Sequence, residues 1–458
     1  MDVIAAISTG NVPTAIGIVR VSGAGCFSLC DAVFRAVSGK VFGDLPPRKM
    51  SFGEMLDREG RVLDRGLAVR FPGPRSYTGE DSAEFHCHGS PVVLRELLDA
   101  LFAQGARQAR PGEFTRRAFL NGRLDLTQAE AVIDLIDAET AAAARNAAAQ
   151  LDGSLRRDFE TISDTLLDLS SRFYAVVDYP DEDIQDIHPE EIAATLRTVD
   201  AALTRLLATC GRGQILKHGV RTAIVGRPNA GKSSLLNALA GYERAIVTEI
   251  PGTTRDTVEE SVLCGGVLLR LIDTAGIRET TDAVELLGVE RSRSAVETAD
   301  LVLAVVDSSQ PFTDEDLALL DLASRQERWI LISSKQDLPS APLPVLSWEP
   351  PCHEPAAVVS LSARTGQGLS DLESAVAALF PQGETPAGEI LTGERQQSAV
   401  REAQSAIRRG LAGLETGLTP DAILTDVEAA LDALGQLTGK TAKEEIVSRI
   451  FARFCVGK

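Results

Sequence analysis

Apolar residues recur at helical spacing in two separate parts of the chain. In the first part they follow one another at intervals of three or four residues, at Leu155, Phe159, Ile162, Leu166, Leu169 and Phe173, and again at Ile192, Leu196, Val199, Leu203 and Leu206. In the second part the same spacing returns at Val400, Ala403, Ile407, Leu411 and Leu414, and at Leu424, Val427, Leu431 and Leu434. This spacing places apolar side chains on one face of a helix, so each run predicts a long amphipathic helix.

The chain before residue 118 has a different pattern. Short runs of β-forming residues, such as residues 16–21 and 66–71, alternate with turns rich in Gly and Pro, which predicts an α+β domain. The pattern changes after Leu124. There, Thr127 and Glu130 have the spacing of a capping box at the start of a long Ala-rich helix.

Between the two helical parts, apolar strands are predicted at residues 222–225, 267–272, 329–332 and 358–359, with a helix at residues 234–239. Both flanking parts have the same spacing of apolar residues, which would form one apolar seam along each helix. We therefore expect an α/β domain inserted in a loop of a single helical bundle. Two separate helical domains are the alternative. The predicted fold is therefore multidomain, α/β and α+β. Its parts are an α+β domain (residues 1–118), a first helical part (119–215), the inserted α/β domain (216–383) and a second helical part (384–458).

Composition narrows the classes of function. The formal charge of −19 argues against broad, nonspecific binding to nucleic acid, although it allows RNA on a localised patch or on a second subunit. No run of about eighteen apolar residues occurs and no basic residue precedes Arg20, so neither a membrane span nor a signal peptide is expected. The seven cysteines are an odd number without metal spacing, which indicates reduced thiols in a cytoplasm. The run His86-Cys87-His88 resembles a metal site, but neighbouring residues on a strand face opposite ways.

Residues 226–233 fit the pattern G-x-x-x-x-G-K-[ST], with a predicted strand before them and a predicted helix after them. Each residue type has a chemical reason. Glycines let backbone N–H groups surround a polyphosphate, Lys232 reaches the β- and γ-phosphate oxygens, and the Ser233 hydroxyl binds Mg²⁺. The loop predicts nucleotide binding; a chance Gly- and Lys-rich turn is the alternative for an isolated match.

Further motifs follow in the order that a guanine nucleotide-binding domain requires. Residues 252–256 form a loop whose hydroxyls are able to complete the Mg²⁺ shell, and residues 273–276 (Asp-Thr-Ala-Gly) follow an apolar strand. Residues 334–337 (Ser-Lys-Gln-Asp) follow another such strand, and residues 362–364 (Ser-Ala-Arg) come after the last one. The carboxylate of Asp337 can accept the N1 and N2 protons of guanine, which adenine does not offer. The set of motifs predicts a GTP-binding domain.

Two positions depart from the usual patterns of such domains. The base-binding motif normally begins with Asn, whose amide braces the loop; Ser334 keeps only one end of that bridge, so we expect somewhat weaker nucleotide binding. The residue after Asp-Thr-Ala-Gly is Gln in Ras-like GTPases, but here it is Ile277, whose side chain cannot orient the attacking water. Glu285, in an acidic stretch, is a candidate for that role, and a solvated helix face is the alternative.

Further short motifs are spread along the chain. They are residues 71–74 (Phe-Pro-Gly-Pro), 77–81 (Tyr-Thr-Gly-Glu-Asp), 109–115 (Ala-Arg-Pro-Gly-Glu-Phe-Thr), 117–122 (Arg-Ala-Phe-Leu-Asn-Gly), 124–126 (Leu-Asp-Leu), the Pro-Asn-Ala-Gly-Lys-Ser loop and residues 455–458 (Cys-Val-Gly-Lys). In these motifs, and over essentially its whole length, the chain resembles the tRNA modification GTPases of the MnmE (TrmE) family. The resemblance implies a folate-binding N-terminal domain that dimerises, a helical domain, and a Ras-like P-loop G domain inserted in the helical domain.

The resemblance also implies an activity. With the FAD-dependent MnmG protein, in a heterotetramer or larger complex, family members install a carboxymethylaminomethyl or aminomethyl group on C5 of the wobble uridine of certain tRNAs. The one-carbon unit comes from a 5-formyl- or methylene-tetrahydrofolate. Members hydrolyse GTP with Mg²⁺ and with K⁺, which takes the place of an arginine finger when two G domains meet. We therefore expect a cytoplasmic homodimer without membrane contact.

Matching positions carry the family's site residues onto this sequence. The K⁺ ligands would be Asn229, Thr248, Ile250 and Thr253, and the Mg²⁺ ligands Ser233 and Thr254. The residues implied in GTP binding are Asn229, Ala230, Gly231, Lys232, Ser233, Ser234, Thr248, Glu249, Ile250, Pro251, Gly252, Thr253, Thr254, Asp273, Thr274, Ala275, Gly276, Ser334, Lys335, Gln336, Asp337, Ser362, Ala363 and Arg364. The folate contacts would be Arg20, Glu84, Lys458 and, in place of the usual Lys, Arg123.

Two catalytic roles also follow from the resemblance. Glu285 falls where the family's water-orienting Glu lies, and Cys455 matches a cysteine that the family needs for modification. For Cys455, a buried structural thiol is the alternative.

A ribosome-assembly switch GTPase of the Era/Der kind is the competing interpretation, because it shares the phosphate loop, Gly-Thr-Thr-Arg and Asp-Thr-Ala-Gly. Those switches carry basic RNA-binding modules, whereas this chain is acidic in total and has a folate-like domain and a cysteine tail. A folate-dependent methyltransferase with an appended GTPase lacks any separate signature. The sequence therefore favours a modification GTPase.

Overall fold

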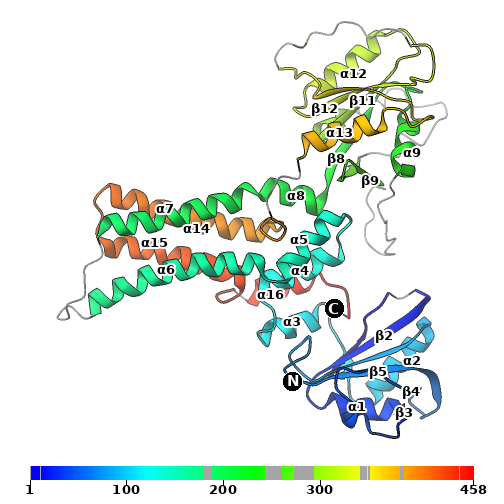
Figure 1. The fold of residues 1–458 in the computed structure, drawn as a ribbon, viewed down its shortest axis with the longest axis vertical. Coiled ribbons are helices and arrows are strands. Elements are labelled where there is room, and N and C mark those ends of the chain that lie inside the picture. Colours follow the sequence, from blue (N-terminus) through cyan, green and yellow to red (C-terminus); the bar gives the residue numbers. More distant parts are fainter. Residues whose placement is uncertain are drawn as a thin grey trace. The chain divides into compact units, whose positions relative to one another are not determined.

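The computed structural model describes residues 2–10, 12–178, 188–242, 260–272, 293–340, 348, 351–381, 386–442 and 444–457 (Figure 1). The chain divides into two compact units. One comprises Met1–Ile133, Ala148–Leu203 and Ser398–Lys458, and the other comprises Asp134–Ala147 and Thr204–Gln397. The first unit contains the N-terminal domain and most of the long helices. The second contains the inserted α/β domain with the segments that lead into and out of it.

The N-terminal domain is a sheet with helices on one face. The strand order is β3-β4-β5-β6-β2-β1-β7, and all neighbours are antiparallel except β1 and β7. In chain order the elements are β1 (Ile4–Ile7), β2 (Thr14–Ser22), α1 (Cys26–Val33), β3 (Phe34–Ala36), the 3-10 helix η1 (Phe42–Asp44), β4 (Ser51–Leu56), β5 (Val62–Phe71), β6 (Ser82–Gly89), α2 (Pro91–Ala103) and β7 (Arg107–Gln108). Val19, Val21 and Phe85 of the sheet share one buried cluster with Leu97 and Leu101 of α2. The α+β prediction is confirmed.

Large apolar side chains are exposed on the other face of this sheet. The exposed fractions are 61% for Ile16 on β2, 39% for Leu67 on β5 and 54% for Phe52 on β4. Leu67 pairs across the strands with Phe52 on one side and with His86 on the other, and Ile16 lies two residues before Ile18, the partner of His86. Residues in such register share one face of a sheet. These side chains form an exposed apolar patch, a feature that marks interaction or ligand-binding surfaces in other proteins.

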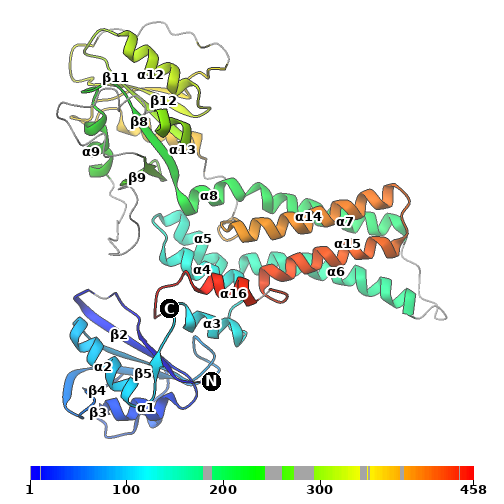
Figure 2. The same cartoon turned by 180° about the vertical axis from the view of Figure 1, so that it is seen from behind.

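The helical part is built from long helices whose seams are buried. The helices α6 (Ser154–Asp178), α7 (Pro189–Ala208), α14 (Glu394–Glu415) and α15 (Pro420–Thr438) run side by side in both views (Figure 1 and Figure 2). The predicted seams of α6, α7 and α14 are buried, except that Phe173, Leu411 and Leu414 are half-buried. Burial is complete for Leu155, Phe159, Leu166, Leu196, Leu203, Val400 and Ile407. On α15, Val427 and Leu434 are buried as predicted, whereas Ile423 and Ala430 are buried in place of the half-buried Leu424 and Leu431. None of the described helices is long and apolar enough to cross a lipid bilayer.

The predicted Ala-rich helix is interrupted. It forms two shorter helices, α4 (Leu126–Ile136) and α5 (Ala141–Leu151). The capping box predicted for Thr127 and Glu130 was wrong. The Asp125 carboxylate caps α4 instead, because it accepts hydrogen bonds from the Gln128 N–H (2.8 Å) and the Thr127 hydroxyl (2.7 Å). A charged acceptor just before the first turn binds free N–H groups more strongly than a hydroxyl does, so the helix begins earlier than predicted.

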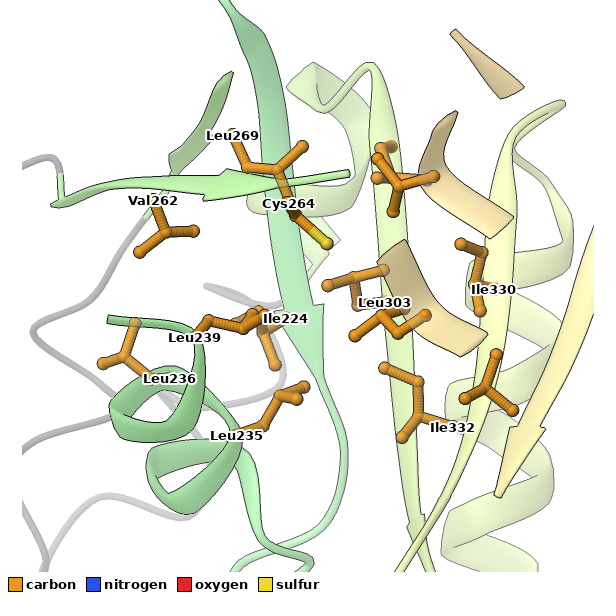
Figure 3. Packing of buried hydrophobic residues seen from close by; sticks show 14 of the residues in the cluster. Ile224, Leu235, Leu236, Leu239, Val262, Cys264, Leu269, Leu303, Ile330 and Ile332 are labelled. Atoms are coloured by element: carbon orange, nitrogen blue, oxygen red, sulfur yellow. The ribbon is translucent and has the colours of Figure 1, made fainter. Parts of the chain in front are cut away.

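The inserted domain is a mostly parallel sheet with helices on both faces. The strand order is β13-β12-β11-β8-β10-β9, and only β9 and β10 are antiparallel neighbours. In chain order the elements are β8 (Val220–Val225), α9 (Lys232–Tyr242), β9 (Glu260–Cys264), β10 (Val267–Leu271), β11 (Leu301–Asp307), α12 (Asp314–Ser324), β12 (Trp329–Ser334), β13 (Ala357–Ser360) and α13 (Leu369–Leu379). Figure 3 shows Leu235, Leu236 and Leu239 of α9 near Ile224 of β8 in the core on one side of the sheet. The predicted strands and helix of this part are confirmed.

The two connections of the inserted domain lie against each other. The chain enters through α8 (Cys210–His218), and residues 388–392 lead away from the domain. The backbone N–H of Leu391, a residue with no exposed surface, donates to the Thr209 hydroxyl at 3.0 Å. Gly213 of α8 leaves room for this contact, because a Cβ at that position would lie 1.8 Å from the Leu391 carbonyl oxygen. Entry and exit therefore meet, as the insertion of a domain into a loop requires.

Gly213→Ala is expected to lower the free energy of unfolding by roughly 1–3 kcal/mol, because the added methyl group forces the backbone at Leu391 to move. Gly211→Ala on the same helix is the matched control, since a Cβ at Gly211 meets no atom within 4 Å. The control should be neutral or stabilise the protein by up to about 1 kcal/mol. Chemical denaturation of both variants measures the difference, and equal midpoints would show that the contact yields to a methyl group.

Candidate functional site

The phosphate-binding loop joins β8 to α9 in a tight turn. Its first residue lies against the neighbouring strand: a Cβ at Gly226 would be 2.3 Å from the carbonyl oxygen of Val305 on β11. Asn229 has a positive φ of 61°, a conformation that Asn adopts more readily than most residues. The Ala230 N–H closes the turn by donating to the Arg227 carbonyl at 3.2 Å. The loop leads directly into the N-terminus of α9, and the free N–H groups at a helix N-terminus favour bound anions.

Lys232 lies across this loop. Its ammonium group donates to the carbonyl oxygens of Gly226 (2.7 Å) and Arg227 (2.8 Å). Burial lowers the pKa of Lys232, while the charge of Glu315 acts in the opposite direction. The ammonium group is thus held on the loop by two carbonyl oxygens.

Ser334 connects the base-binding motif to the phosphate-binding loop. It is the last residue of β12 and is 5% exposed. Its hydroxyl lies 2.6 Å from the Ala230 carbonyl oxygen and 3.0 Å from that of Val306. A hydroxyl has one proton and donates to one of these carbonyls at a time, whereas the amide of the usual Asn has two N–H donors. Ser334 therefore links the two motifs with one hydrogen bond at a time, where Asn would form two.

The turn after β12 is held by the end of β11. Lys335 has a positive φ of 59°, and its ammonium group pairs with Asp307 at 2.6 Å. The Gln336 amide donates to the Ser308 hydroxyl at 3.1 Å. Although burial acts in the opposite direction, the hydrogen bond from Lys335 helps to hold the pKa of Asp307 below its ordinary value, so the carboxylate is charged at neutral pH. These contacts fix the turn that carries Asp337.

The carboxylate of Asp337 is oriented by residues that follow β13. The Ser362 hydroxyl donates to one Asp337 oxygen at 2.8 Å, and the Arg364 guanidinium lies 3.6 Å from the other. Ser362 has no exposed surface, whereas the Arg364 side chain is 83% exposed. Because β12 and β13 are parallel neighbours, the residues after them meet at the same sheet edge. The Asp337 carboxylate is therefore held at this edge by Ser362 and Arg364.

Other predicted site residues lie outside the residues that the structure describes. These are Thr248, Glu249, Ile250, Pro251, Gly252, Thr253, Thr254, Asp273, Thr274, Ala275, Gly276, Glu285 and Lys458. Their roles stay predictions. Among the described site residues, Asn229 and Ser234 are exposed, Ser233 and Ala363 are half-buried, and Ala230 is buried.

A second cluster lies on the N-terminal sheet. Arg20 of β2 and Glu84 of β6 are cross-strand partners and form an ion pair at 2.9 Å, with 24% and 19% of their side chains exposed. The Arg20 guanidinium also lies 5.4 Å from the centre of the Tyr77 ring and 5.7 Å from that of Phe114. A hydrogen bond that Glu84 accepts from His86, together with the charge of Arg20, holds the pKa of Glu84 below its usual value. The structure thus brings two of the predicted folate contacts together.

Arg123 lies beside the loop that carries Tyr77. It follows α3 (Glu113–Leu120), and an added Cβ at Gly79 would be 3.2 Å from the Cγ atom of Arg123. The Asn121 amide donates to the carbonyl of Thr78 in the same loop at 2.7 Å. Arg20 and Arg123 therefore contact the same loop.

The C-terminal tail lies on the N-terminal domain. It follows α16 (Glu444–Phe451), and its backbone is held by the Gly112 N–H, which donates to the Cys455 carbonyl at 3.4 Å. Farther along, the Ser8 hydroxyl donates to the Gly457 carbonyl at 3.1 Å. Cys455 is exposed, so the alternative of a buried structural thiol is wrong. The other cysteines are buried or half-buried, and none of the seven forms a disulfide.

The run His86-Cys87-His88 does not gather three side chains around one point. Cys87 is buried, whereas His88 is exposed on the same strand. His88 contacts Asp64 at 2.9 Å, and His86 contacts Glu84 at 3.3 Å. No group of three or more His, Cys, Asp or Glu side chains in the described ranges is placed to hold a metal ion.

Sequence reasoning missed the residues outside the motifs whose side chains bond to motif residues. Asp307 and Ser308 hold the base-binding turn, and Asp316 pairs with Arg227 of the phosphate-binding loop at 2.6 Å. The spacing of Thr313 and Asp316 is a capping signal that could have marked the start of α12. No pattern in the sequence relates Asp316 to a loop 89 residues away.

A parallel sheet with a Gly-x-x-x-x-Gly-Lys-Ser loop after β8 and a Ser-Lys-Gln-Asp turn after β12 is the arrangement of a P-loop GTP-binding domain. The comparison with protein families is more specific. The profile of the MnmE helical domain matches residues 126–455, and that of the GTP-binding protein TrmE N-terminus matches residues 3–123. The chain belongs to the MnmE family of tRNA modification GTPases.

Individual relatives match the whole chain. The tRNA modification GTPase MnmE of Roseiflexus sp. (strain RS-1) is 44% identical over 464 residues, which cover 100% of this chain and 99% of the relative. That of Geobacillus kaustophilus (strain HTA426) is 42% identical over 461 residues, with 100% and 99% covered. Among solved structures, the G domain of the T. maritima FeoB iron transporter matches 35% of this chain and 98% of its own, at 26% identity and a TM-score of 0.24. The predicted family, fold class and enzyme class are confirmed by the family profiles and the full-length relatives.

Ser334→Asn is expected to tighten GDP and GTP binding by about two- to twelvefold, the effect of one added hydrogen bond worth about 0.5–1.5 kcal/mol. The reason is that an amide can donate to the Ala230 and Val306 carbonyls together. Ser334→Ala removes the hydroxyl and is the matched control, which should bind more weakly than the wild type. Titration with a fluorescent guanine nucleotide measures all three proteins. Unchanged or weaker binding by the Asn variant would mean that the loop has repacked around the serine.

Proposed function

We propose that this protein is a K⁺-activated GTPase that works with an FAD-dependent partner of the MnmG type. Together they would install a carboxymethylaminomethyl or aminomethyl group on C5 of the wobble uridine of certain tRNAs, with the one-carbon unit supplied by a tetrahydrofolate. The observation that carries the proposal is the hydrogen bond from Ser334 to Ala230, which joins the phosphate-binding loop to the guanine-selecting turn. This joint lies in a chain whose MnmE relatives match it from end to end.

GTP would bind along the edge formed by β8, β12 and β13. Lys232 would neutralise the β- and γ-phosphates, and Asp337, oriented by Ser362, would accept the two N–H groups of guanine. Glu285 would orient the attacking water, because Ile277 lacks a polar group for that purpose. The other GTP contacts predicted above belong to the same proposal.

The metal ligands fit hard cations. The Ser233 hydroxyl would hold Mg²⁺ together with Thr254, and the Asn229 side chain would ligate K⁺ together with the segment from Thr248 to Thr253. The fit rests on Asn229, whose exposed side chain stands on a loop with a positive φ of 61° beside the phosphate-binding turn. A cation there supplies positive charge near the β- and γ-phosphates, as an arginine finger does.

The N-terminal cluster fits a folate. Glu84 is a charged acceptor suited to the N–H edge of a pterin, and Arg20 is a guanidinium suited to a carboxylate of the glutamate tail. Tyr77 and Phe114, which flank Arg20, offer ring faces in the same place. Arg123 and Lys458 would add positive charge for the tail.

We further infer a homodimer through the N-terminal domain. The exposed apolar face around Ile16, Phe52 and Leu67 supports this assignment, because a second copy would bury it. tRNA would be the macromolecular substrate, in the cytoplasm, and the helical part would be interrupted by the G domain near residues 216 and 383. A ribosome-assembly switch of the Era/Der kind is not favoured, since the MnmE relatives match the whole chain and not the G domain alone.

The proposed function is tested by mass analysis of wobble nucleosides from cells that lack this protein. Modified uridines should disappear and return when the wild-type gene is supplied. Unchanged nucleosides would contradict the modification role, and GTP hydrolysis by the purified protein would then be measured separately.

GTP hydrolysis is expected to be faster in K⁺ than in Na⁺ at equal ionic strength, because Asn229 and the segment that follows form a cation site. Asn229→Ala should erase this difference. Ser370→Ala, at an exposed position of α13 outside the nucleotide motifs, is the control and should keep it. Phosphate release in the two salts measures the effect. A K⁺ response that survives Asn229→Ala would place the ion elsewhere.

Cys455→Ser should abolish tRNA modification in complemented cells and leave GTP hydrolysis near the wild-type rate. Serine keeps the size of the side chain but removes most of its nucleophilicity. Cys352→Ser, in the inserted domain, is the control and should retain both activities. Full modification by Cys455→Ser would show that the thiol has no role in the chemistry, and the loss of both activities would show that the tail is structural.

A further inference from the structure

A buried ion pair supports the phosphate-binding loop from outside the nucleotide motifs. The Arg227 guanidinium, in the second residue of the loop, donates from Nε to Oδ1 of Asp316 on α12 at 2.6 Å. The Arg227 side chain is 18% exposed and that of Asp316 only 1%. Charges withdrawn from water to this extent need a well-placed partner, whereas exposed ion pairs contribute little. The pair is therefore a specific contact between the loop and α12.

Arg227 meets Lys232 through its backbone. The Arg227 carbonyl accepts hydrogen bonds from the Lys232 ammonium group (2.8 Å) and from the Ala230 N–H (3.2 Å). The direction of this carbonyl depends on the backbone conformation of Arg227. The ion pair with Asp316 restricts that conformation because it fixes the Arg227 side chain. A loosened Arg227 would therefore displace an acceptor of Lys232 and the turn that contains Asn229.

Asp316 is itself fixed in the first turn of α12. Its Oδ2 atom accepts from the N–H (3.0 Å) and the hydroxyl (2.9 Å) of Thr313, while the Asp316 N–H donates back to that hydroxyl at 3.4 Å. This capping box leaves Oδ1 for Arg227. Leu320 and Ala323 of the same helix are buried against β11 and β12. The carboxylate thus presents Arg227 with an oxygen that the sheet holds in place.

We propose that Arg227 and Asp316 are a positioning pair for GTP hydrolysis. They hold the phosphate-binding loop in the conformation from which Lys232 reaches the β- and γ-phosphate oxygens. Neither side chain is assigned to the nucleotide itself, and the inference rests on the GTPase function proposed above. Phosphoryl transfer depends on the placement of charge around the γ-phosphate, so a pair that sets the loop acts on the transition state as well as on ground-state binding.

Arg227→Gln in the full-length protein is the direct test. We expect the Kd of GDP and GTP to rise by about tenfold or more, the scale of a lost hydrogen bond to a charged group. We also expect kcat at saturating GTP to fall. Arg227→Lys keeps the charge but not the planar guanidinium, so it should recover part of both losses. Fluorescent nucleotide titration measures Kd, and single-turnover phosphate release measures the chemical step.

Arg325→Gln is the matched control, because it breaks another Arg–Asp pair of α12, the exposed contact of Arg325 with Asp321 at 2.8 Å, and leaves Arg227 and Asp316 intact. It should keep Kd and kcat within about twofold of the wild type, because exposed ion pairs contribute little. If it reproduces the losses of Arg227→Gln, or if Arg227→Gln binds and hydrolyses GTP like the wild type, the pair only stabilises the domain and the proposal is wrong.

A double variant covers the case in which Arg227→Gln does not fold. Arg227→Gln with Asp316→Asn leaves no unpaired charge in the interior and should fold, with the same loss of affinity and turnover. Wild-type affinity in this folded double variant would also overturn the proposal. Failure of the wild-type protein to bind GTP would instead contradict the GTPase function, so the two ideas fail separately.

Discussion

Parallel pairing of β8, β11, β12 and β13 is the constraint on which the nucleotide site depends. Parallel strands end at one edge, so the loop after β8, the turn after β12 and Ser362 after β13 reach the same place. The hydrogen bond between Ser334 and Ala230 joins residues 104 positions apart in the chain. Burial of every residue in β11 and β12 holds the strands in this register, because a shift would expose apolar side chains to water.

Two ion pairs beside the nucleotide motifs hold charged side chains of those motifs in place. Lys335 is paired with Asp307, and Arg227 with Asp316. Each carboxylate is 8% exposed or less, so its removal from water is offset only if the cation stays in one position. Such pairs add little net stability but favour one conformation of the turns they hold.

The N-terminal domain and the tail show how distant segments are combined within one unit. Gly457 bonds to Ser8, and Gly112 bonds to Cys455, so the end of the chain is seated on its first domain. Arg20 and Glu84 face each other because antiparallel register makes them direct neighbours. The proposed folate site and the proposed dimer surface therefore both lie on this sheet.

The sequence by itself determined the order of the elements, the nucleotide motifs and the family, because phosphate loops, apolar seams and short motifs are local patterns. It also located Ser334 as an incomplete brace. Only the tertiary structure decided which distant residues these segments contact. Asp316 pairs with Arg227, Asp307 pairs with Lys335, and Leu391 packs against Gly213. The tertiary structure also moved the cap of α4 from Thr127 to Asp125. Some of these contacts join residues far apart in the chain, and the choice of cap depends on competition between neighbouring acceptors. Neither kind of contact produces a pattern that can be recognised in a single sequence.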